Sequence, residues 1–274
     1  MSHLLPVAAG FDLSAIDTSS TPGFTGEKKD AERELASNGA ELGGLQERLF
    51  AESRVGGTRS VLLVLQAMDT AGKGGIVRHV IGDTDPQGIQ LHAFKAPTDE
   101  EKAHDFLWRI RNELPEAGKI GVFDRSHYED VLIHRVRGFS TPEVIEERYG
   151  IINEFERELS ESGTTIIKVM LHISSNEQKA RLQERLDRPD KHWKYNPGDV
   201  DERLQWDAYQ AAYQIALTQT STVDAPWYVI PADRKWYARW AVQQLLLDAL
   251  RRLDPQWPPV DYDVEIEKVR LAAT

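Results

Sequence analysis

One stretch constrains the fold more than any other part of the chain. Residues 60–68 (SVLLVLQAM) are almost continuously apolar, and a glycine-rich segment, 70–75 (TAGKGG), follows one residue later. The apolar run is too short for the roughly 20 residues of a membrane-spanning helix, and it suits a strand that is buried on both faces. A buried strand, a glycine-rich turn and a helix beginning near Lys73 together predict one unit of a parallel α/β sheet.

The rest of the chain repeats this alternation of strand and helix. Apolar runs predict strands at 60–68, 89–95, 119–125, 164–173 and 227–233. Helical spacing predicts helices at 27–54, from about 73, and at 98–114, 143–160, 175–186, 200–218 and 235–253. We expect a three-layer α/β/α fold with a five-stranded parallel sheet. The expected parts are an N-terminal arm and helix (1–55), the α/β domain (56–255) and a C-terminal tail (256–274).

The amino-acid composition limits the classes of molecule that this protein can bind. The chain has 274 residues, a net charge of −11 and no cysteine, so disulfides and cysteine zinc sites are excluded. An acidic protein repels nucleic acid and anionic membranes on average, and we expect neither as a partner. The N-terminus lacks the basic start of a signal peptide, which together with the absence of cysteine favours a cytoplasmic location. Any polyanion must therefore bind at a local basic patch.

The segment 69–75 predicts a phosphate site. A glycine-rich turn between a strand and a helix directs successive backbone N–H groups to one point, and Lys73 adds a cation. The candidate phosphate-binding residues are Thr70, Ala71, Gly72, Lys73, Gly74 and Gly75. The loop departs from the usual G-x-x-x-x-G-K-[ST] pattern, because Ala67 replaces the first glycine and Gly74 replaces the Ser/Thr that binds magnesium. The alternative is a plain glycine-rich turn with a surface lysine.

Two carboxylates offer a replacement for the missing hydroxyl. Asp69 and Asp124 each follow or end a predicted strand, so both belong at the same edge of a parallel sheet. Two carboxylates can hold one hydrated Mg²⁺, with Mn²⁺ as the alternative ion. A carboxylate among phosphates would otherwise be repulsive. The alternative reading of Asp124 is a pair with Arg125 or a cap for the next helix.

A basic stripe follows the fourth predicted strand. Its members are Arg181, Arg185, Arg188, Lys191 and Lys194. The arginines are spaced for one helix face. In nucleotide kinases a mobile lid at this place supplies arginines that offset charge on the transferred phosphoryl group. A solvated face is the alternative, because carboxylates are interleaved with the cations.

Four stretches together resemble the type-2 polyphosphate kinase family: QAMDTAGKGG, FDRSHYEDV, RLQERLDRPDKHWKYNPGD and APWYVIPADRKWYARW. The resemblance covers about residues 30–255. It implies a thymidylate-kinase-like P-loop fold with a helical lid at about 181–200. It also implies Mg²⁺-dependent phosphoryl transfer between inorganic polyphosphate and a nucleotide. By the same resemblance, Asp69 and Asp124 bind magnesium and phosphates, and Lys73 and Arg125 contact the transferring phosphate. Arg185, Arg188 and the lid lysines would contact phosphates.

The resulting hypothesis is reversible transfer from polyphosphate to ADP, giving ATP, with AMP as a second acceptor. Two alternatives remain open at the level of sequence. One is a nucleoside or nucleotide kinase that uses ATP as donor, and the other is a non-catalytic module that binds polyphosphate or a nucleotide. We also expect a homo-oligomer, a dimer or tetramer, with the N-terminal helix and the segment DYDVEIEKVR as candidate contact surfaces.

Overall fold

The computed structural model describes residues 4–274 and contains a single parallel sheet. Its strands are β1 (Ser60–Ala67), β2 (Ile89–Ala93), β3 (Ile120–Asp124), β4 (Thr164–His172) and β5 (Trp227–Pro231). They lie side by side in the order β2-β3-β1-β4-β5, and every pairing is parallel. Each strand matches a predicted one to within two residues at either end. The five-stranded parallel sheet is confirmed.

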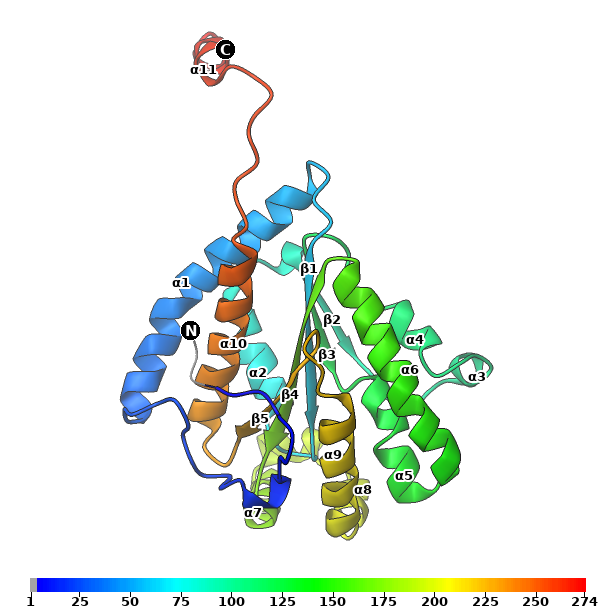
Figure 1. Cartoon of the computed structure of the whole chain (residues 1–274). Helices are drawn as coiled ribbons and strands as arrows, with labels where there is room; N and C mark the ends of the chain where they lie inside the picture. The colour runs from blue at the N-terminus through cyan, green and yellow to red at the C-terminus, as the bar shows by residue number, and fades with distance from the viewer. Residues whose placement is uncertain (1–3) are drawn as a thin grey trace.

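Helices cover both faces of the sheet (Figure 1). One face packs against α1 (Lys28–Ser53), α2 (Lys73–His79) and α10 (Lys235–Leu253). The other face packs chiefly against α6 (Pro142–Glu161) and α9 (Trp206–Thr220). Neighbouring residues of β1 point to opposite faces, as in any strand, so Leu63 belongs to one core and Leu62 to the other. The predicted α/β/α layering is therefore confirmed.

The N-terminal segments belong to this same body. Leu42, Leu45 and Leu49 of α1 are buried in the core shared with α10, so residue 55 does not separate two cores. The arm before α1 contains a short 3-10 helix, η1 (Leu13–Ala15), and runs beside β5 and α9. Among its contacts, Val7 donates its backbone N–H to the carbonyl of Trp227 at 2.8 Å.

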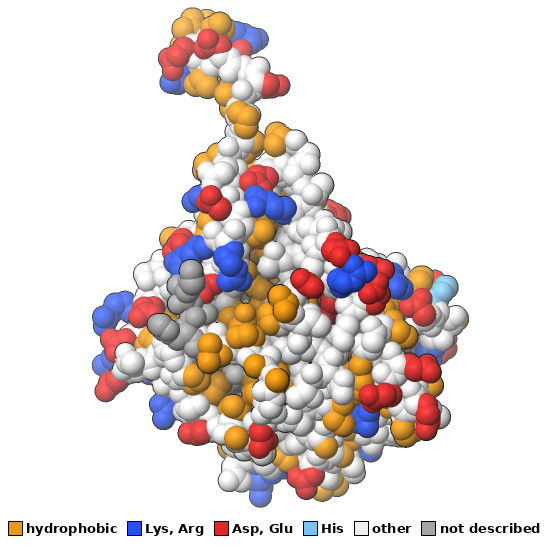
Figure 2. Space-filling view, viewed as in Figure 1, with side chains coloured by type: hydrophobic (Ala, Val, Ile, Leu, Met, Phe, Trp, Pro, Cys, Tyr) orange, Lys and Arg blue, Asp and Glu red, His pale blue; other side chains and the backbone are white. Residues whose placement is uncertain are grey.

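The C-terminal tail leaves the body. After α10, an extended segment leads to α11 (Val264–Ala272), which stands clear of the rest of the molecule in Figure 1. No residue of α11 is buried. Apolar side chains are visible on this projecting part in Figure 2. Trp257, Ile266 and Val269 of this part of the chain are exposed. Among the described residues, no helix is long and apolar enough to span a membrane.

Two predicted helices are wrong in their extent. The helix expected at 98–114 is two short helices, α3 (Asp99–Lys102) and α4 (Trp108–Arg111). Thr98 and Glu101 do form the predicted capping box of α3. The break follows from Asp105, whose side chain accepts a hydrogen bond from the backbone of Leu107 and so competes with helical bonding.

The helix expected at 200–218 is likewise two helices, α8 (Gly198–Arg203) and α9. Arg203 donates to the carbonyl of Ser175 and to the side chain of Gln178, which ties α8 to α7 (Ser175–Asp187). The buried face of α9 packs instead on the sheet core. The two stretches therefore pack against different parts of the protein.

The carboxyl ends of the strands meet the lid region. The predicted lid, about 181–200, contains the second half of α7, the 3-10 helix η5 (Pro189–Lys194) and the start of α8. In Figure 1, α7 and α8 lie at the end of the sheet to which the strand arrows point. The remaining elements are α5 (Ile133–Arg137) and three 3-10 helices: η2 (Ile81–Asp83), η3 (Pro86–Gly88) and η4 (His127–Asp130).

Candidate active site

The loop between β1 and α2 has a specialised backbone. Gly72 has a φ of +122°, a region that L side chains rarely adopt, and Thr70 has a φ of +68°. The hydroxyl of Thr70 is buried and has no hydrogen-bond partner among residues 4–274. Such unfavourable features persist where surrounding structure enforces them, and they gather at ligand sites.

Arg181 fixes this loop in place. Its guanidinium donates to the carbonyls of Thr70 (3.0 Å) and Ala71 (2.8 Å), and on the other side to those of Ala232 (2.6 Å) and Asp233 (3.0 Å). Its Nε donates to Glu177 at 2.7 Å. All five N–H groups are therefore used inside the protein. Arg181 lines the cavity described below, but its hydrogen bonds connect the loop to the turn after β5.

The two candidate metal ligands lie at one edge of the sheet, as predicted from strand ends. Asp69 pairs with Arg125 at 2.7 Å, and Asp124 lies 3.9 Å from Lys73. Arg125 has a φ of +66°, so a second non-glycine residue here adopts a left-handed backbone. The pKa of Arg125 is above its usual value, chiefly because of the Glu129 carboxylate. Burial opposes the shift, and Asp69 adds to it.

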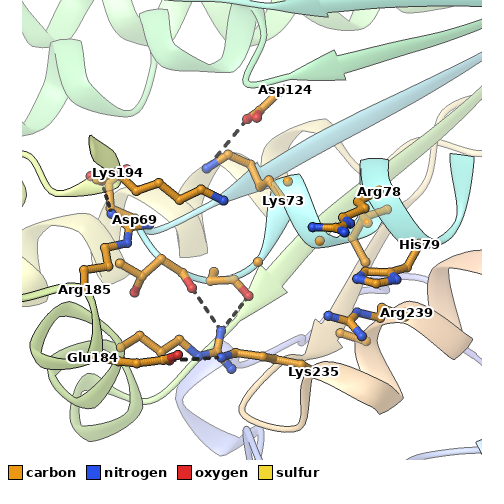
Figure 3. A pocket seen from close by; sticks show the side chains of 18 of the residues that line it. Asp69, Lys73, Arg78, His79, Asp124, Glu184, Arg185, Lys194, Lys235 and Arg239 are labelled. Carbon is orange, nitrogen blue, oxygen red and sulfur yellow. Dashed lines mark hydrogen bonds and ion pairs between the residues drawn. The ribbon is translucent and has the colours of Figure 1, made fainter. Parts of the chain in front are cut away.

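These residues line a cavity of about 470 Å³ (Figure 3). Nine cations line it: Lys73, Arg78, Arg125, Arg181, Arg185, Lys191, Lys194, Lys235 and Arg239. Only three carboxylates do so, those of Asp69, Asp124 and Glu184. A protein with a net charge of −11 thus concentrates positive charge in one hollow. This is the local basic patch that a polyanion would need.

The cavity brings together nearly all the predicted site residues. The backbone and side chains of 69–75, Asp124, Arg125, Arg181, Arg185, Lys191 and Lys194 all line it. Arg185 donates to Asp199 and to the carbonyl of Lys194, which links α7 to η5. Arg188 does not line the cavity. It is 48% exposed and pairs with Glu184 and Asp190.

Sequence reasoning missed one wall of the cavity. Arg78 and His79 come from the end of α2, and Lys235 and Arg239 come from the start of α10. The i, i+4 spacing of Lys235 and Arg239 places them on one helix face and was the available signal. Burial lowers the pKa of His79, and Arg239 and Arg78 lower it further, whereas Asp83 opposes the shift.

A second, smaller cavity of about 200 Å³ adjoins the first. Asp69 and Arg125 line both cavities. The smaller one is also lined by Glu129, Tyr209 and Tyr213. Burial raises the pKa of Glu129, although Arg125 and Lys73 oppose the shift. Glu129 was also missed by sequence reasoning, although it lies in the FDRSHYEDV stretch.

The carboxylates suit a magnesium ion better than a metal held wholly by protein. Asp69 and Asp124 are 23% and 30% exposed and face the same cavity. Among residues 4–274, no group of three or more His, Cys, Asp or Glu side chains could hold a metal. Mg²⁺ typically takes one or two carboxylates and completes its shell with waters and substrate phosphates. The donor set fits that ion.

Comparison with known proteins identifies the family. The model of the polyphosphate kinase 2 family matches residues 25–258. The chain belongs to the polyphosphate kinase 2 family. It is therefore a polyphosphate kinase, as the four sequence stretches predicted. Its fold is also that of a solved member: the crystal structure of polyphosphate kinase 2 from Arthrobacter aurescens TC1 is 59% identical and matches with a TM-score of 0.96. That match covers 98% of this chain and 95% of the other.

Two curated relatives of this polyphosphate kinase 2 carry substrate names. The chain is 47% identical to an AMP/ADP-polyphosphate phosphotransferase from Meiothermus ruber, over 90% of this chain and 91% of that protein. It is 41% identical to an ADP-polyphosphate phosphotransferase from Rhodopseudomonas palustris, over 85% of this chain and 83% of the relative.

Proposed function

We propose that this polyphosphate kinase transfers the terminal phosphoryl group of inorganic polyphosphate to ADP, giving ATP, and to AMP, giving ADP. The observation that carries the proposal is the cavity lined by nine cations and three carboxylates. The names of the two relatives support ADP as acceptor in both cases and AMP in one.

The larger cavity suits the polyphosphate. Cations approach it from four elements: the loop and end of α2, the end of β3, the lid and the start of α10. A linear polyanion carries charge on every phosphate. Its binding site therefore needs several cations spread along the bound polyphosphate chain. Lys235 and Arg239 of α10, together with Lys191 and Lys194 of η5, supply several such cations.

The smaller cavity suits the acceptor nucleotide. Tyr209 and Tyr213 provide aromatic surface for a base, and Arg125 provides a cation for its phosphate. Because Asp69 and Arg125 line both cavities, two phosphate groups bound on either side would meet there. This shared wall is where the transfer would take place.

The chemistry needs no strong general base. The second pKa of a terminal phosphate is about 6, so the attacking oxygen is already largely ionised at neutral pH. Lys73 and Arg125 would balance charge on the transferred group, and Arg185 would approach it from the lid. One phosphoanhydride is exchanged for another, so the reaction is reversible.

Asp69 and Asp124 would hold Mg²⁺. When bound, the ion neutralises phosphate charge and orients the phosphates of both substrates. In the structure, the same carboxylates pair with Arg125 and Lys73. Those two cations are then free to turn to phosphate when the carboxylates bind metal.

The test is a nucleotide chromatogram. Purified protein, Mg²⁺ and long-chain polyphosphate are incubated with ADP or with AMP in separate tubes, and a parallel set replaces polyphosphate by ATP with nucleoside acceptors. We expect ATP from ADP, ADP from AMP, and no product in the parallel set. Product only in the parallel set would favour an ATP-dependent kinase, and product in no tube would overturn the proposal.

A further inference from the structure

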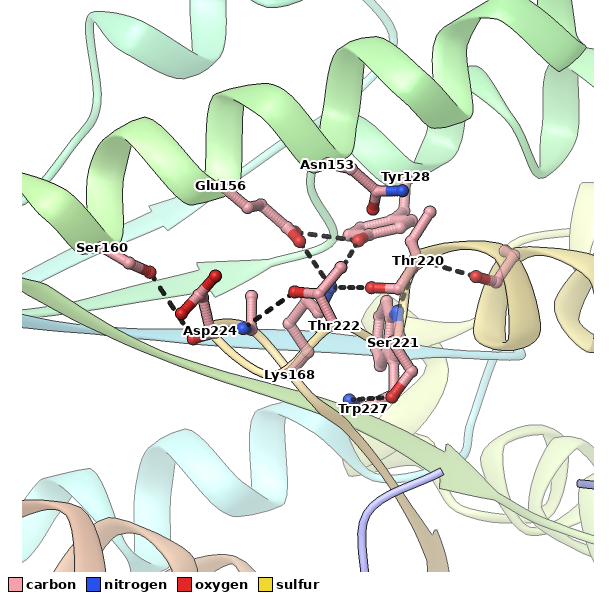
Figure 4. A network of polar contacts seen from close by, with 12 residues as sticks. Tyr128, Asn153, Glu156, Ser160, Lys168, Thr220, Ser221, Thr222, Asp224 and Trp227 are labelled. Atoms are coloured by element: carbon pink, nitrogen blue, oxygen red, sulfur yellow. Dashed lines mark hydrogen bonds and ion pairs between the residues drawn. The ribbon is translucent and has the colours of Figure 1, made fainter. Parts of the chain in front are cut away.

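A buried lysine lies behind the proposed site. Lys168 is the one charged residue of β4, and its side chain has no exposed surface. Its ammonium donates to the carboxylate of Glu156 at 2.5 Å, to the carbonyl of Thr220 at 2.7 Å and to the hydroxyl of Tyr128 at 2.8 Å (Figure 4). Three donors thus meet three acceptors, which fits the protonated amine.

Glu156 gathers the other polar groups around this lysine. Its second carboxylate oxygen accepts a hydrogen bond from the hydroxyl of Tyr128 at 2.8 Å and lies 3.3 Å from Nε2 of His127. Burial alone raises the pKa of Glu156, but Lys168 and then His127 outweigh it, so the pKa is below its usual value. Both Tyr128 and His127 are therefore held by one buried carboxylate on α6.

These two side chains belong to the segment that carries the site. Arg125 and Glu129 line the cavities, whereas His127 and Tyr128, which lie between them in sequence, point into the buried network. Ser126 is also anchored, because its hydroxyl lies 3.0 Å from the amide of Gln66 on β1. Residues 126–128 thus point into the protein, between two residues that line the cavities.

The anchors counteract an unfavourable backbone. Arg125 has a φ of +66°, which costs energy for a non-glycine residue and persists only when neighbouring contacts enforce it. One enforcing contact is the hydrogen bond from its N–H to the carbonyl of Leu65. His127 and Tyr128, which Glu156 fixes, follow two and three residues later.

We propose that Glu156 is a positioning residue for phosphoryl transfer: by binding His127 and Tyr128 it keeps Arg125 and Glu129 aimed into the cavities. The proposal rests on the proposed function, because it assigns Arg125 to the transferred phosphate. Stability alone does not require the pair, since well-packed apolar residues usually replace a buried ion pair without loss.

Two double variants separate a role of Glu156 in positioning the site from a role in stability. Lys168→Met with Glu156→Gln removes the charges but leaves an acceptor for Tyr128 and His127. Lys168→Met with Glu156→Leu removes the same charges and the acceptor. Below the melting temperature of both, we expect the Gln variant to keep most of the wild-type kcat. We expect the Leu variant to fall about tenfold below it, because small misplacements of catalytic groups are costly.

The KM and a control variant show whether the loss of kcat comes from the transition state or from a general loss of stability. The KM for polyphosphate should change little in either variant, since the loss belongs to the transition state. Gln243→Met is the matched control for a lost buried hydrogen bond, because Gln243 is buried on the opposite face of the sheet and donates to Leu35. It should lower the melting temperature without lowering kcat.

Equal kcat values for the two double variants would overturn the proposal. If either fails to fold, Tyr128→Phe decides, because it removes only the hydroxyl that joins Lys168 to Glu156. A kcat about threefold lower at unchanged KM supports positioning, and an unchanged kcat contradicts it. Wild-type protein without polyphosphate-driven conversion would overturn the proposed function itself, which is a separate outcome.

Discussion

At the scale of single residues, two lid arginines that look equivalent in sequence have different surroundings. Arg185 lines the cavity and is 23% exposed, whereas Arg188 is 48% exposed and pairs with carboxylates on the surface. The helical spacing that placed both on one face could not show that α7 ends at Asp187, so that Arg188 lies outside the helix with an extended backbone.

The matched variants Arg185→Met and Arg188→Met test this difference. We expect Arg185→Met to lower kcat/KM for polyphosphate about tenfold or more, because it removes the proposed charged contact to phosphate. Arg188→Met should have little effect, since exposed ion pairs contribute little. Steady-state kinetics with varied polyphosphate measures both. Equal losses would show that the lid rearranges to bring Arg188 into the site.

A second prediction at this scale concerns His79. Its pKa is below the usual value in the free protein, chiefly through burial and then through Arg239 and Arg78. Bound polyphosphate would raise that pKa, because a nearby anion favours the charged imidazole. Binding therefore takes up a proton, and affinity should rise as the pH falls through the pKa that His79 has in the complex.

Calorimetric titration with tripolyphosphate at several pH values measures this linkage. Tripolyphosphate also changes its protonation with pH. His79→Gln is therefore the matched control, because its pH dependence contains the contribution of the ligand without that of His79. The wild-type affinity should rise more steeply on acidification than that of His79→Gln. Parallel pH profiles would show that His79 does not gain a proton on binding.

At the scale of elements, the strands could be predicted closely because each is an apolar run with polar ends. The breaks at Asp105 and after Arg203 could not, since they depend on one side chain's local hydrogen bond and on a contact with α7. The buried network around Lys168 could not be predicted from the sequence either. Lys168 is 40 residues from Tyr128 and 52 from Thr220, and only the folded sheet brings them together.

The phosphate loop also offers a prediction at this scale. Gly72 has a φ of +122°, whereas a Cβ at Gly74 would meet nothing within 4 Å and would lie at the start of α2. Gly72→Ala should destabilise the protein by about 1–3 kcal/mol and impair activity, because it strains the loop backbone. Gly74→Ala should be neutral or stabilise by up to about 1 kcal/mol. Urea unfolding measures the free energy of unfolding of both variants. Equal changes in the two variants would contradict the backbone conformation described for this loop.

At the scale of the whole molecule, the projecting tail stands out because its apolar side chains do not pack against the α/β body. A helix of nine residues is marginal in water by itself, and none of the residues of α11 is buried by the part of the chain that the structure describes. Its apolar side chains Ile266, Val269 and Leu271 are all more than half exposed. The homo-oligomer expected from the sequence would give such side chains a place to pack.

Deleting residues 258–274 tests that expectation. The free energy of unfolding of the α/β body should change little, because the deleted part contributes no buried residue to either core. Light scattering should show the full chain as a dimer or tetramer and the truncated chain as a smaller species. A full chain that is already monomeric would contradict the expected assembly, and an unchanged oligomer would place the contact elsewhere, for example on α1.

The central claim is that a metal-binding carboxylate edge inside a cationic cavity performs the transfer. Its most direct test is the initial rate of ATP formation from ADP and polyphosphate with Mg²⁺, for the wild type and for Asp124→Asn. Asp261→Asn, an exposed aspartate in the tail segment, is the control for a changed charge. We predict a loss of at least about 10²-fold for Asp124→Asn alone. A rate for Asp124→Asn close to that of the wild type would contradict the account.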